Sequence, residues 1–222
     1  PAHRARREYR YHQLFAEYLR DRFERSDRAQ FASLQRRIAG WFAERGLVAD
    51  AINHAILSGD DMLVASILED AGGWRLVPQG LQGVVVRGLS KLPVPMIRAR
   101  PRLALAQVYL QIKLGELGAA RAEYDLFRAQ SDAADLSVDL KTEVRVVGDT
   151  LTDYENQPVT FDDLLAREAL LRKLPANDHL VLANISETLG PKYLEGGWLE
   201  RALQPTLAAR DHYLAIGSLY SD

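Results

Sequence analysis

Apolar residues recur at helical spacing along almost the whole chain. One stripe runs through the segment YRYHQLFAEYL at residues 9–19 and reaches Phe23, and a second begins at Phe31. Apolar side chains three or four positions apart fall on one face of an α-helix. Ser26 and Asp27 stand between the stripes as candidate N-caps, and Gly46 follows the second stripe, where a helix-ending glycine is common. The pattern predicts two helices joined by a short turn.

The same periodicity continues through the rest of the chain. Further helices are expected over about residues 48–58, 63–71, 101–114, 119–129, 136–154, 160–174 and 198–210, with one more opened by Asn177 or Asp178. Residues 74–95 are the least regular, and the run GVVVRG within them has a strand-like composition but no partner strand. The sequence therefore predicts an all-α fold of about ten to twelve short helices. Such a chain forms either a bundle or a solenoid, and internal repeats distinguish the two.

Internal repeats favour the solenoid. The segment LGPKYLEGGWLERALQPTLAA has the tetratricopeptide spacing at Leu189, Gly190, Tyr193, Gly197, Ala202 and Ala209. The small residues Gly190 and Ala202 are expected to let two helices approach closely. Weaker matches surround Gly46 and Gly115, which lie about two repeat lengths of roughly 34 residues apart. We predict a tetratricopeptide-like, helical-repeat, right-handed superhelix, with an irregular α-helical bundle as the alternative.

Composition limits the binding partners and the cellular location that are expected of this chain. The 222 residues include 30 acidic and 28 basic side chains, so a net charge of -2 gives no overall attraction to nucleic acid. Cysteine is absent, which removes disulfides and thiolate metal sites and favours a cytoplasmic location. Apolar runs are too short for a membrane span, so no membrane partner is expected. Because residue 1 is proline rather than methionine, we expect the chain to be an excised fragment.

Candidate catalytic and metal-binding residues have simpler structural interpretations. The five histidines show no metal-ligand spacing, and His12 and His54 lie among apolar residues, where packing or capping is expected. The acidic pairs at 60–61 and 162–163 fall at predicted helix starts, where carboxylates offset the helix macrodipole. No nucleophile stands beside a plausible base. We therefore expect no metal site and no enzymatic activity.

Several motifs in the first 130 residues follow the order found in one family of regulators. They are YRYHQLF at residues 9–15, WFAERGL at 41–47, AINHA at 51–55 and RPRL at 100–103. In these motifs the chain resembles the MalT-type, LuxR-class large ATP-binding (STAND-type) transcription activators. Members of that family join a nucleotide-binding oligomerisation module, a winged-helix segment, a helical-repeat sensor and a DNA-binding helix-turn-helix. The resemblance implies that residues 1–25 end the winged-helix segment and that residues 26–222 form a C-terminally truncated sensor domain.

The resemblance also implies which functions belong to this fragment and which belong to other domains of the regulator. The chain has no G-x-x-x-x-G-K-[ST] motif, so no cofactor is expected in this fragment and ATP is expected in the missing nucleotide-binding module. No segment resembles the family's recognition helix, so no direct DNA contact is expected. The implied partners are a small-molecule inducer or a regulatory protein, together with the regulator's own nucleotide-binding domain. Such a sensor would control ATP-dependent oligomerisation and DNA binding by the missing domains. The alternative is a tetratricopeptide-type scaffold that holds a peptide in its groove.

The sequence also gives two expectations for individual residues. Ligands of repeat proteins usually sit on the concave surface. By register, Tyr109 and Lys113 on one inner helix, and Asn184 and Glu187 on another, should face that surface and contact the ligand. The opening aromatic stripe is expected to be a packed junction, in which case Phe15→Ala would cost about 3–5 kcal/mol.

Overall fold

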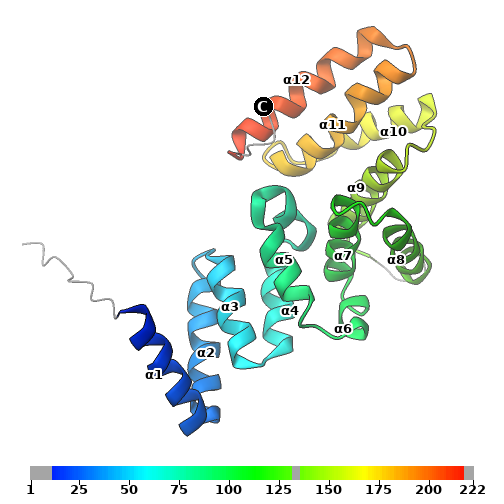
Figure 1. Ribbon diagram of the computed structural model, residues 1–222. Coiled ribbons are helices and arrows are strands. Elements are labelled where there is room, and N and C mark those ends of the chain that lie inside the picture. The colour runs from blue at the N-terminus through cyan, green and yellow to red at the C-terminus, as the bar shows by residue number, and fades with distance from the viewer. Residues whose placement is uncertain (1–11, 132–135, 218–222) are drawn as a thin grey trace, which may run out of the picture.

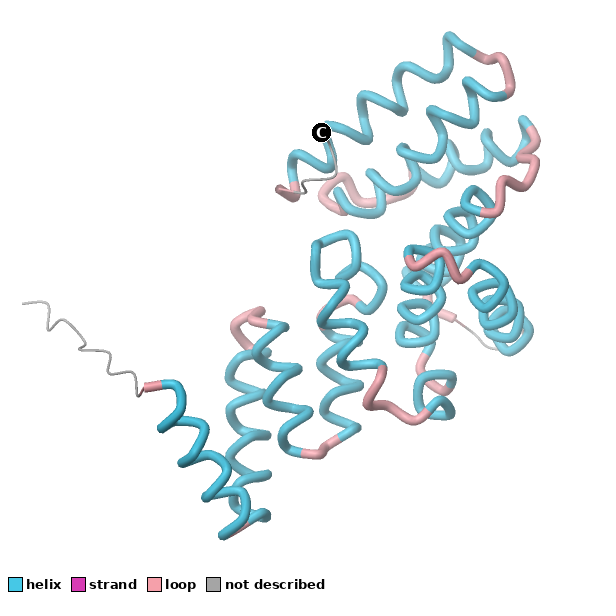
Figure 2. Tube along the Cα trace, viewed as in Figure 1, coloured by secondary structure: helices cyan, strands magenta, loops and turns pink. Residues whose placement is uncertain are grey.

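The computed structural model describes residues 12–131 and 136–217, and the elements in those ranges are helices joined by loops and turns, with no strand (Figures 1 and 2). The elements are α1 (Gln13–Ser26), α2 (Arg28–Ala43), α3 (Val48–Ser58), α4 (Asp61–Asp70), a 3₁₀ turn η1 (Gly73–Leu76), a π turn η2 (Val77–Leu81), α5 (Gln82–Leu89), α6 (Val94–Arg98), α7 (Pro101–Lys113), α8 (Leu117–Ser131), α9 (Val138–Tyr154), α10 (Phe161–Leu171), α11 (His179–Glu195) and α12 (Leu199–Ala215). None of these helices is long and apolar enough to cross a membrane. The predicted all-α fold is confirmed, while the right-handed superhelix stays a prediction.

Local signals set most helix boundaries. Asp27 and Asp60 accept backbone N–H hydrogen bonds at the starts of α2 and α4, at 2.9 and 3.0 Å. Thr160 and Asp163 form a reciprocal capping box at the start of α10. Gly59 ends α3 in the left-handed conformation, with φ of 69°. Both acidic pairs noted in the sequence therefore lie at helix starts, as predicted.

The least regular segment of the sequence is a compact helical corner. Gly72 and Gly73 have φ of 108° and 59°, and this left-handed turn directs the chain from α4 into η1. Trp74 is fully buried there and packs against Tyr109 of α7, with ring centroids 5.1 Å apart. The run GVVVRG lies within α5 rather than a strand. The corner thus fastens the first half of the chain to α7.

The helices follow one another along an arc, from α1 and α2 at one end to α10–α12 at the other (Figure 1). Consecutive helices pack as pairs: α2 on α3, α7 on α8 and α11 on α12. Helix α9 also contacts both α7 and α11 across these pairs. This arrangement repeats helix pairs along the chain, as a helical-repeat protein does.

Helices α7 and α9 run in the same direction. Near their starts, Arg102 and Glu143 form an ion pair at 3.3 Å, and near their ends Lys113 donates a hydrogen bond to Tyr154 at 2.6 Å. The two partners are 41 positions apart in both cases. A constant separation at both ends requires parallel helices in a fixed register.

Helices α9 and α11 show the same relation with a shorter separation. Asp153 and Thr188 both accept hydrogen bonds from Arg167, at 3.0 and 3.1 Å. Glu143 and Asp178 both lie close to Arg75, at 3.9 and 2.7 Å. Each of these pairs spans 35 positions, close to the roughly 34 residues of a tetratricopeptide repeat. We refer to α7, α9 and α11 as the parallel-helix row.

The opening stripe is not a packed core in this chain. Helix α1 contacts α2 through an edge-to-face pair of Phe23 and Phe31, whose centroids are 5.7 Å apart. Leu14, Phe15 and Tyr18 nevertheless remain 70%, 48% and 55% exposed. The expectation that Phe15 is a core residue was wrong, because about half of its surface remains exposed.

The Phe15→Ala variant is accordingly expected to lower the free energy of unfolding by no more than about 1 kcal/mol, since a half-exposed ring loses little buried area. Urea denaturation followed by circular dichroism measures this change. A loss of about 3 kcal/mol or more would show that the ring is buried in solution.

Candidate ligand-binding site

The four residues predicted to contact a ligand meet in one polar cluster on the parallel-helix row. Two further tyrosines, one from α9 and one from α12, complete it. We call it the tyrosine–lysine cluster, and it consists of Tyr109, Lys113, Tyr154, Asn184, Glu187 and Tyr213. The Tyr109 hydroxyl donates to Oδ1 of Asn184 at 3.4 Å, which joins α7 to α11. The Tyr213 hydroxyl donates to the Glu187 carboxylate, which joins α12 to α11.

Lys113 is the cation of this cluster. Its Nζ lies 5.3 Å from the ring centroid of Tyr109 and 4.6 Å from that of Tyr154, distances typical of cation–π contacts. Burial alone lowers the pKa of the ammonium, but Tyr109, Tyr154 and the Glu187 carboxylate outweigh it, and the net pKa is raised. Burial raises the pKa of the Tyr109 phenol. At neutral pH Lys113 is therefore an ammonium beside the neutral phenol of Tyr109.

Only part of the cluster is accessible. Tyr109 is 1% exposed, Asn184 4% and Tyr213 6%, so these three side chains support the site from within. Tyr154 is 45% exposed, and Glu187 is exposed as well. A ligand approaching the row would meet the Lys113 ammonium and the Glu187 carboxylate, with the Tyr154 ring beside them. Such a surface offers a hydrogen-bond donor, a hydrogen-bond acceptor and an aromatic ring.

A Lys113→Met variant is expected to lose about 1 kcal/mol of stability, because the methionine keeps the packing of the stem but removes the ammonium from two aromatic rings and a hydroxyl. Tyr154→Phe is the companion variant, since it removes only the hydroxyl. If the 2.6 Å hydrogen bond joins the two side chains in solution, the double variant will cost less than the sum of the single ones. Additive losses in urea denaturation would contradict the contact.

A second polar site lies at the other end of the row, where α7, α9 and α11 begin. We call it the ion-pair cleft. It has a volume of about 470 Å³ and is lined by Glu69, Asp70, Gly72, Arg75, Arg102, Asp139, Thr142, Glu143, Leu174, Pro175, Asn177 and Asp178. Arg75 donates two hydrogen bonds to Asp178, at 2.7 and 3.1 Å, across 103 positions of sequence. That pair connects η1 in the first half of the chain to the start of α11.

Glu143 is the buried acid of the ion-pair cleft, with 2% of its surface exposed. Its Oε1 lies 3.3 Å from Arg102 and 3.9 Å from Arg75, and the buried Trp74 indole is a further donor to this carboxyl. Burial raises the pKa of the Glu143 carboxyl, and the two arginines only partly offset this. Glu143 was not among the residues predicted from the sequence. The available signal was a charged residue in the apolar register of α9, between Leu140 and Val147.

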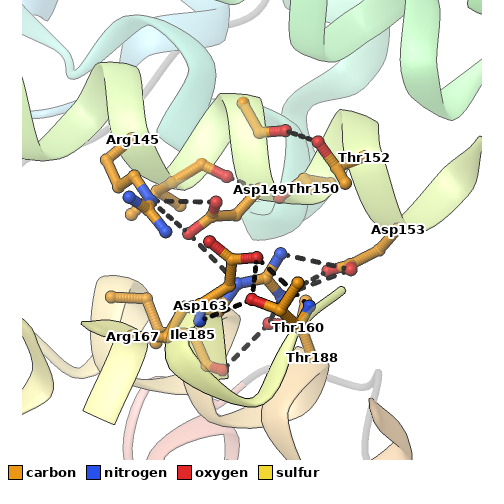
Figure 3. Close-up of polar contacts among 12 residues, drawn as sticks. Arg145, Asp149, Thr150, Thr152, Asp153, Thr160, Asp163, Arg167, Ile185 and Thr188 are labelled. Atoms are coloured by element: carbon orange, nitrogen blue, oxygen red, sulfur yellow. Dashed lines mark hydrogen bonds and ion pairs between the residues drawn. The ribbon is translucent and has the colours of Figure 1, made fainter. Parts of the chain in front are cut away.

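A third polar group holds α10 against α9 and α11 (Figure 3). We call it the Arg167 network, and its members are Arg167, Asp149, Asp153 and Thr188. The Arg167 side chain is 2% exposed, and its guanidinium lies 3.0 Å from Asp153 and 3.3 Å from Asp149. Nη1 and Nη2 donate hydrogen bonds to Asp153 and Thr188, whereas the buried Nε faces Asp149 at 3.3 Å without a hydrogen bond. The network therefore joins α10 to α9 and α11. The network was not predicted from the sequence, although Arg167 stands in the apolar register of α10 after Leu164.

Three histidines have side-chain partners, whereas His12 is exposed and makes no side-chain capping hydrogen bond, so its expected packing or capping role was wrong. Nδ1 of His54 lies 2.5 Å from Oε1 of Gln35, and its ring stacks on Phe42 at 5.4 Å. His179 and His212 bring their Nδ1 atoms to 3.1 Å at the junction of α11 and α12. Within the described ranges, no three metal-ligating side chains converge on one point. The predicted packing role of His54 is confirmed.

Comparison with known proteins identifies relatives of this chain. No family model and no solved structure matches it. The kinase PknK of Mycobacterium tuberculosis is 32% identical over 168 residues, which are 74% of this chain. The HTH-type transcriptional regulator MalT is 32% identical over 137 residues in Vibrio cholerae and 30% identical over 123 residues in Klebsiella pneumoniae, which are 60% and 53% of this chain. The chain is homologous to a segment of the MalT regulators. The resemblance inferred from its motifs is confirmed.

The chain corresponds to a small part of each relative. It spans 15% of the length of PknK and 14% of the length of the MalT proteins. Aligned stretches of 168 and 137 residues must overlap within 222 residues, so part of the segment is shared by PknK and the MalT-type regulators.

Proposed function

We propose that this chain is the signal-sensing regulatory segment of a MalT-type transcription activator. A small-molecule inducer or a regulatory protein binds to the parallel-helix row and favours one arrangement of its helices. The favoured helix arrangement is transmitted to the regulator's own nucleotide-binding domain and so controls ATP-dependent oligomerisation and DNA binding by other domains. The observation that carries the proposal is the homology with a segment of two proteins named as HTH-type transcriptional regulators.

The presence of a related segment in PknK supports a sensing role. One set of relatives is named for transcription regulation and another for protein phosphorylation. A segment shared by proteins with different outputs is better suited to detecting a signal than to producing either output. We accordingly assign no catalysis and no cofactor to this chain, place ATP in a separate module of the regulator, and place the protein in the cytoplasm.

The geometry of the row supports binding at its two ends. The tyrosine–lysine cluster joins α7, α9, α11 and α12, and the ion-pair cleft joins η1, α7, α9 and the start of α11. A ligand at either site touches several repeats at once. Ligands shift a conformational equilibrium only through different affinities for its states, and a site shared by several helices changes when those helices move.

A thermal-shift screen of the chain against sugars, amino acids, amines and other small metabolites tests the proposal. A ligand at a hundredfold excess over its Kd stabilises the folded state by about 2.7 kcal/mol, which corresponds to roughly 5–10 °C in Tm for a chain of this size. A saturable rise that is lost in Lys113→Met or Glu143→Gln supports sensing at the row. The absence of any response across the panel, together with unchanged output of the full regulator when the row is mutated, refutes it.

A peptide-binding scaffold is the second candidate, and a specific surface favours it. Leu199, Leu203 and Leu207 follow one another at i, i+4 spacing on α12 and are 67%, 65% and 37% exposed. Such an exposed apolar stripe is suited to packing against a partner helix. The same screen separates the two functions, because a scaffold would respond to a protein partner and to none of the small molecules.

A further inference from the structure

Two histidines meet at one end of the last helix pair. Helices α11 and α12 are joined by a tight turn at residues 196–198 and pack side by side (Figure 1). His179 is the first residue of α11, and His212 lies in the last turn of α12. Their Nδ1 atoms are 3.1 Å apart. We call these two residues the histidine pair. They connect the two helices at the end opposite the turn, which we call the open end.

The distance between the two nitrogens limits how many protons the pair can bind. In the neutral pair one Nδ1 carries a hydrogen and donates it, while the other accepts through its lone pair. A protonated ring can still donate to a neutral partner. Two protonated rings would both be donors, with no acceptor between them and two like charges in contact. The contact therefore accommodates one added proton but not two.

The charged groups around the pair do little to relieve this conflict. Asp211 of α12 favours protonation of His212, but its carboxylate is already bound by Arg210 at 2.7 Å. On the other side, Asp178 precedes α11 and accepts two hydrogen bonds from Arg75 of η1. Burial, followed by the charge of the other imidazole, lowers the pKa of His212 more than Asp211 raises it. Both nearby carboxylates have a cation of their own, so a second proton on the pair stays uncompensated.

We propose that the histidine pair is a pH-sensitive contact that holds the end of α12 on α11 at neutral pH and releases it on acidification. An imidazole outside such a contact has a pKa of about 6.5. With the helix ends apart, each ring takes up its own proton, whereas the closed pair accommodates only one. Below about pH 6.5 the open form thus binds more protons than the closed form. Acidification favours the form that binds more protons, so the contact stabilises closure above this pH and loses that effect below it.

The expected consequence is confined to the open end. The turn end of the hairpin is held by Trp198, whose ring centroid lies 4.8 Å from that of Phe161. Near the open end, the Tyr213 hydroxyl donates to the Glu187 carboxylate of α11, and burial raises the pKa of that phenol, so it keeps its proton on acidification. The contact that changes is the histidine pair. This inference goes beyond the proposed sensing function and does not depend on it, because it concerns the response of the chain itself to protons.

Amide hydrogen exchange of the whole 222-residue chain at about pH 7 and about pH 5.5, on either side of the ordinary imidazole pKa, tests the proposal. Dividing the exchange rates of residues 208–215 by the intrinsic rate at each pH gives the equilibrium constant for opening of the last turns of α12. His179→Gln and His212→Gln each replace one imidazole by a side chain that does not titrate. His54→Gln is the matched control, because His54 also has a side-chain partner at Nδ1 and a pKa lowered by burial, but packs between α2 and α3.

The opening constant of the wild-type chain is expected to rise about fivefold between the two pH values, because the open form takes up most of one extra proton. Both variants of the pair should abolish this rise, and His54→Gln should keep it. The proposal is overturned if the opening constant does not change with pH, if the rise persists in the variants of the pair, or if the amides of α7 show an equal rise. Circular dichroism melting at about pH 7 shows which variants are folded, and either folded variant of the pair decides.

Discussion

Replacing Arg167 by methionine is expected to lower the free energy of unfolding by about 3–5 kcal/mol, the loss typical of removing one partner from a buried ion pair. The Arg167 side chain is 2% exposed, and its guanidinium lies between Asp149 and Asp153, which are 16% and 12% exposed (Figure 3). Methionine fills much of the volume but leaves these carboxylates without their cation. Urea denaturation monitored by circular dichroism measures the loss.

Arg172→Met is the matched control at the end of the same helix. Arg172 is 72% exposed and approaches Glu168 only at 3.9 Å, so its loss is expected to cost less than about 1 kcal/mol. Equal costs for the two variants would contradict the buried network. Arg167→Lys should recover part of the loss, because a lysine restores the charge but not the fork that reaches Asp153 and Thr188 together.

The deficit of Arg167→Met is also expected to depend on pH. Burial raises the pKa of the Asp153 carboxyl, whereas the charge and hydrogen bonds of Arg167 lower it and so partly offset the effect of burial. Without Arg167 that pKa rises further. A carboxyl with a higher pKa in the folded state binds protons more tightly there, so acidification through the folded pKa favours the folded state. The stability difference between wild type and variant should therefore shrink as the pH falls below neutral. A difference that grows on acidification would contradict this assignment.

Features governed by neighbours in sequence were predictable. The caps at Asp27, Asp60 and Thr160 depend on side chains three positions from their backbone partners, and each was visible as a polar residue before an apolar stripe. The close approach at Gly190 was visible as a small residue in a repeat register. In each case one local pattern determines the conformation, so no knowledge of the rest of the fold is required.

Features governed by distant contacts were not predictable. The Arg75–Asp178 pair joins residues 103 positions apart, and nothing near either residue indicates its partner. Exposure of the opening stripe also escaped prediction, because an apolar face shows only that a helix can pack and not whether a partner is present. The repeat register did bring Tyr109 and Lys113 together with Asn184 and Glu187, but it did not reveal that Tyr109 and Asn184 are buried.

Gly190→Ala is expected to lower the free energy of unfolding by about 2 kcal/mol, because overpacking outweighs the better helix propensity of alanine. A Cβ at Gly190 would lie 2.2 Å from Oγ1 of Thr206 and 3.4 Å from the carbonyl oxygen of Ala202, both on α12. The Thr206 hydroxyl cannot easily move away, since it donates to that same carbonyl at 2.8 Å and its branched side chain is stiff. Thermal or urea denaturation measures the loss.

Gly118→Ala and a double variant sharpen this test. Gly118 is exposed on α8, and an added methyl group there would meet no neighbouring atom within 4 Å, so alanine is expected to be neutral or to stabilise by about 0.5–1 kcal/mol. Adding Thr206→Ala to Gly190→Ala removes the obstructing hydroxyl and should recover most of the lost stability. Recovery would show that close contact between α11 and α12, rather than backbone conformation, requires glycine at position 190. If Thr206→Ala gives no recovery, the close approach that defines this repeat is not present in solution.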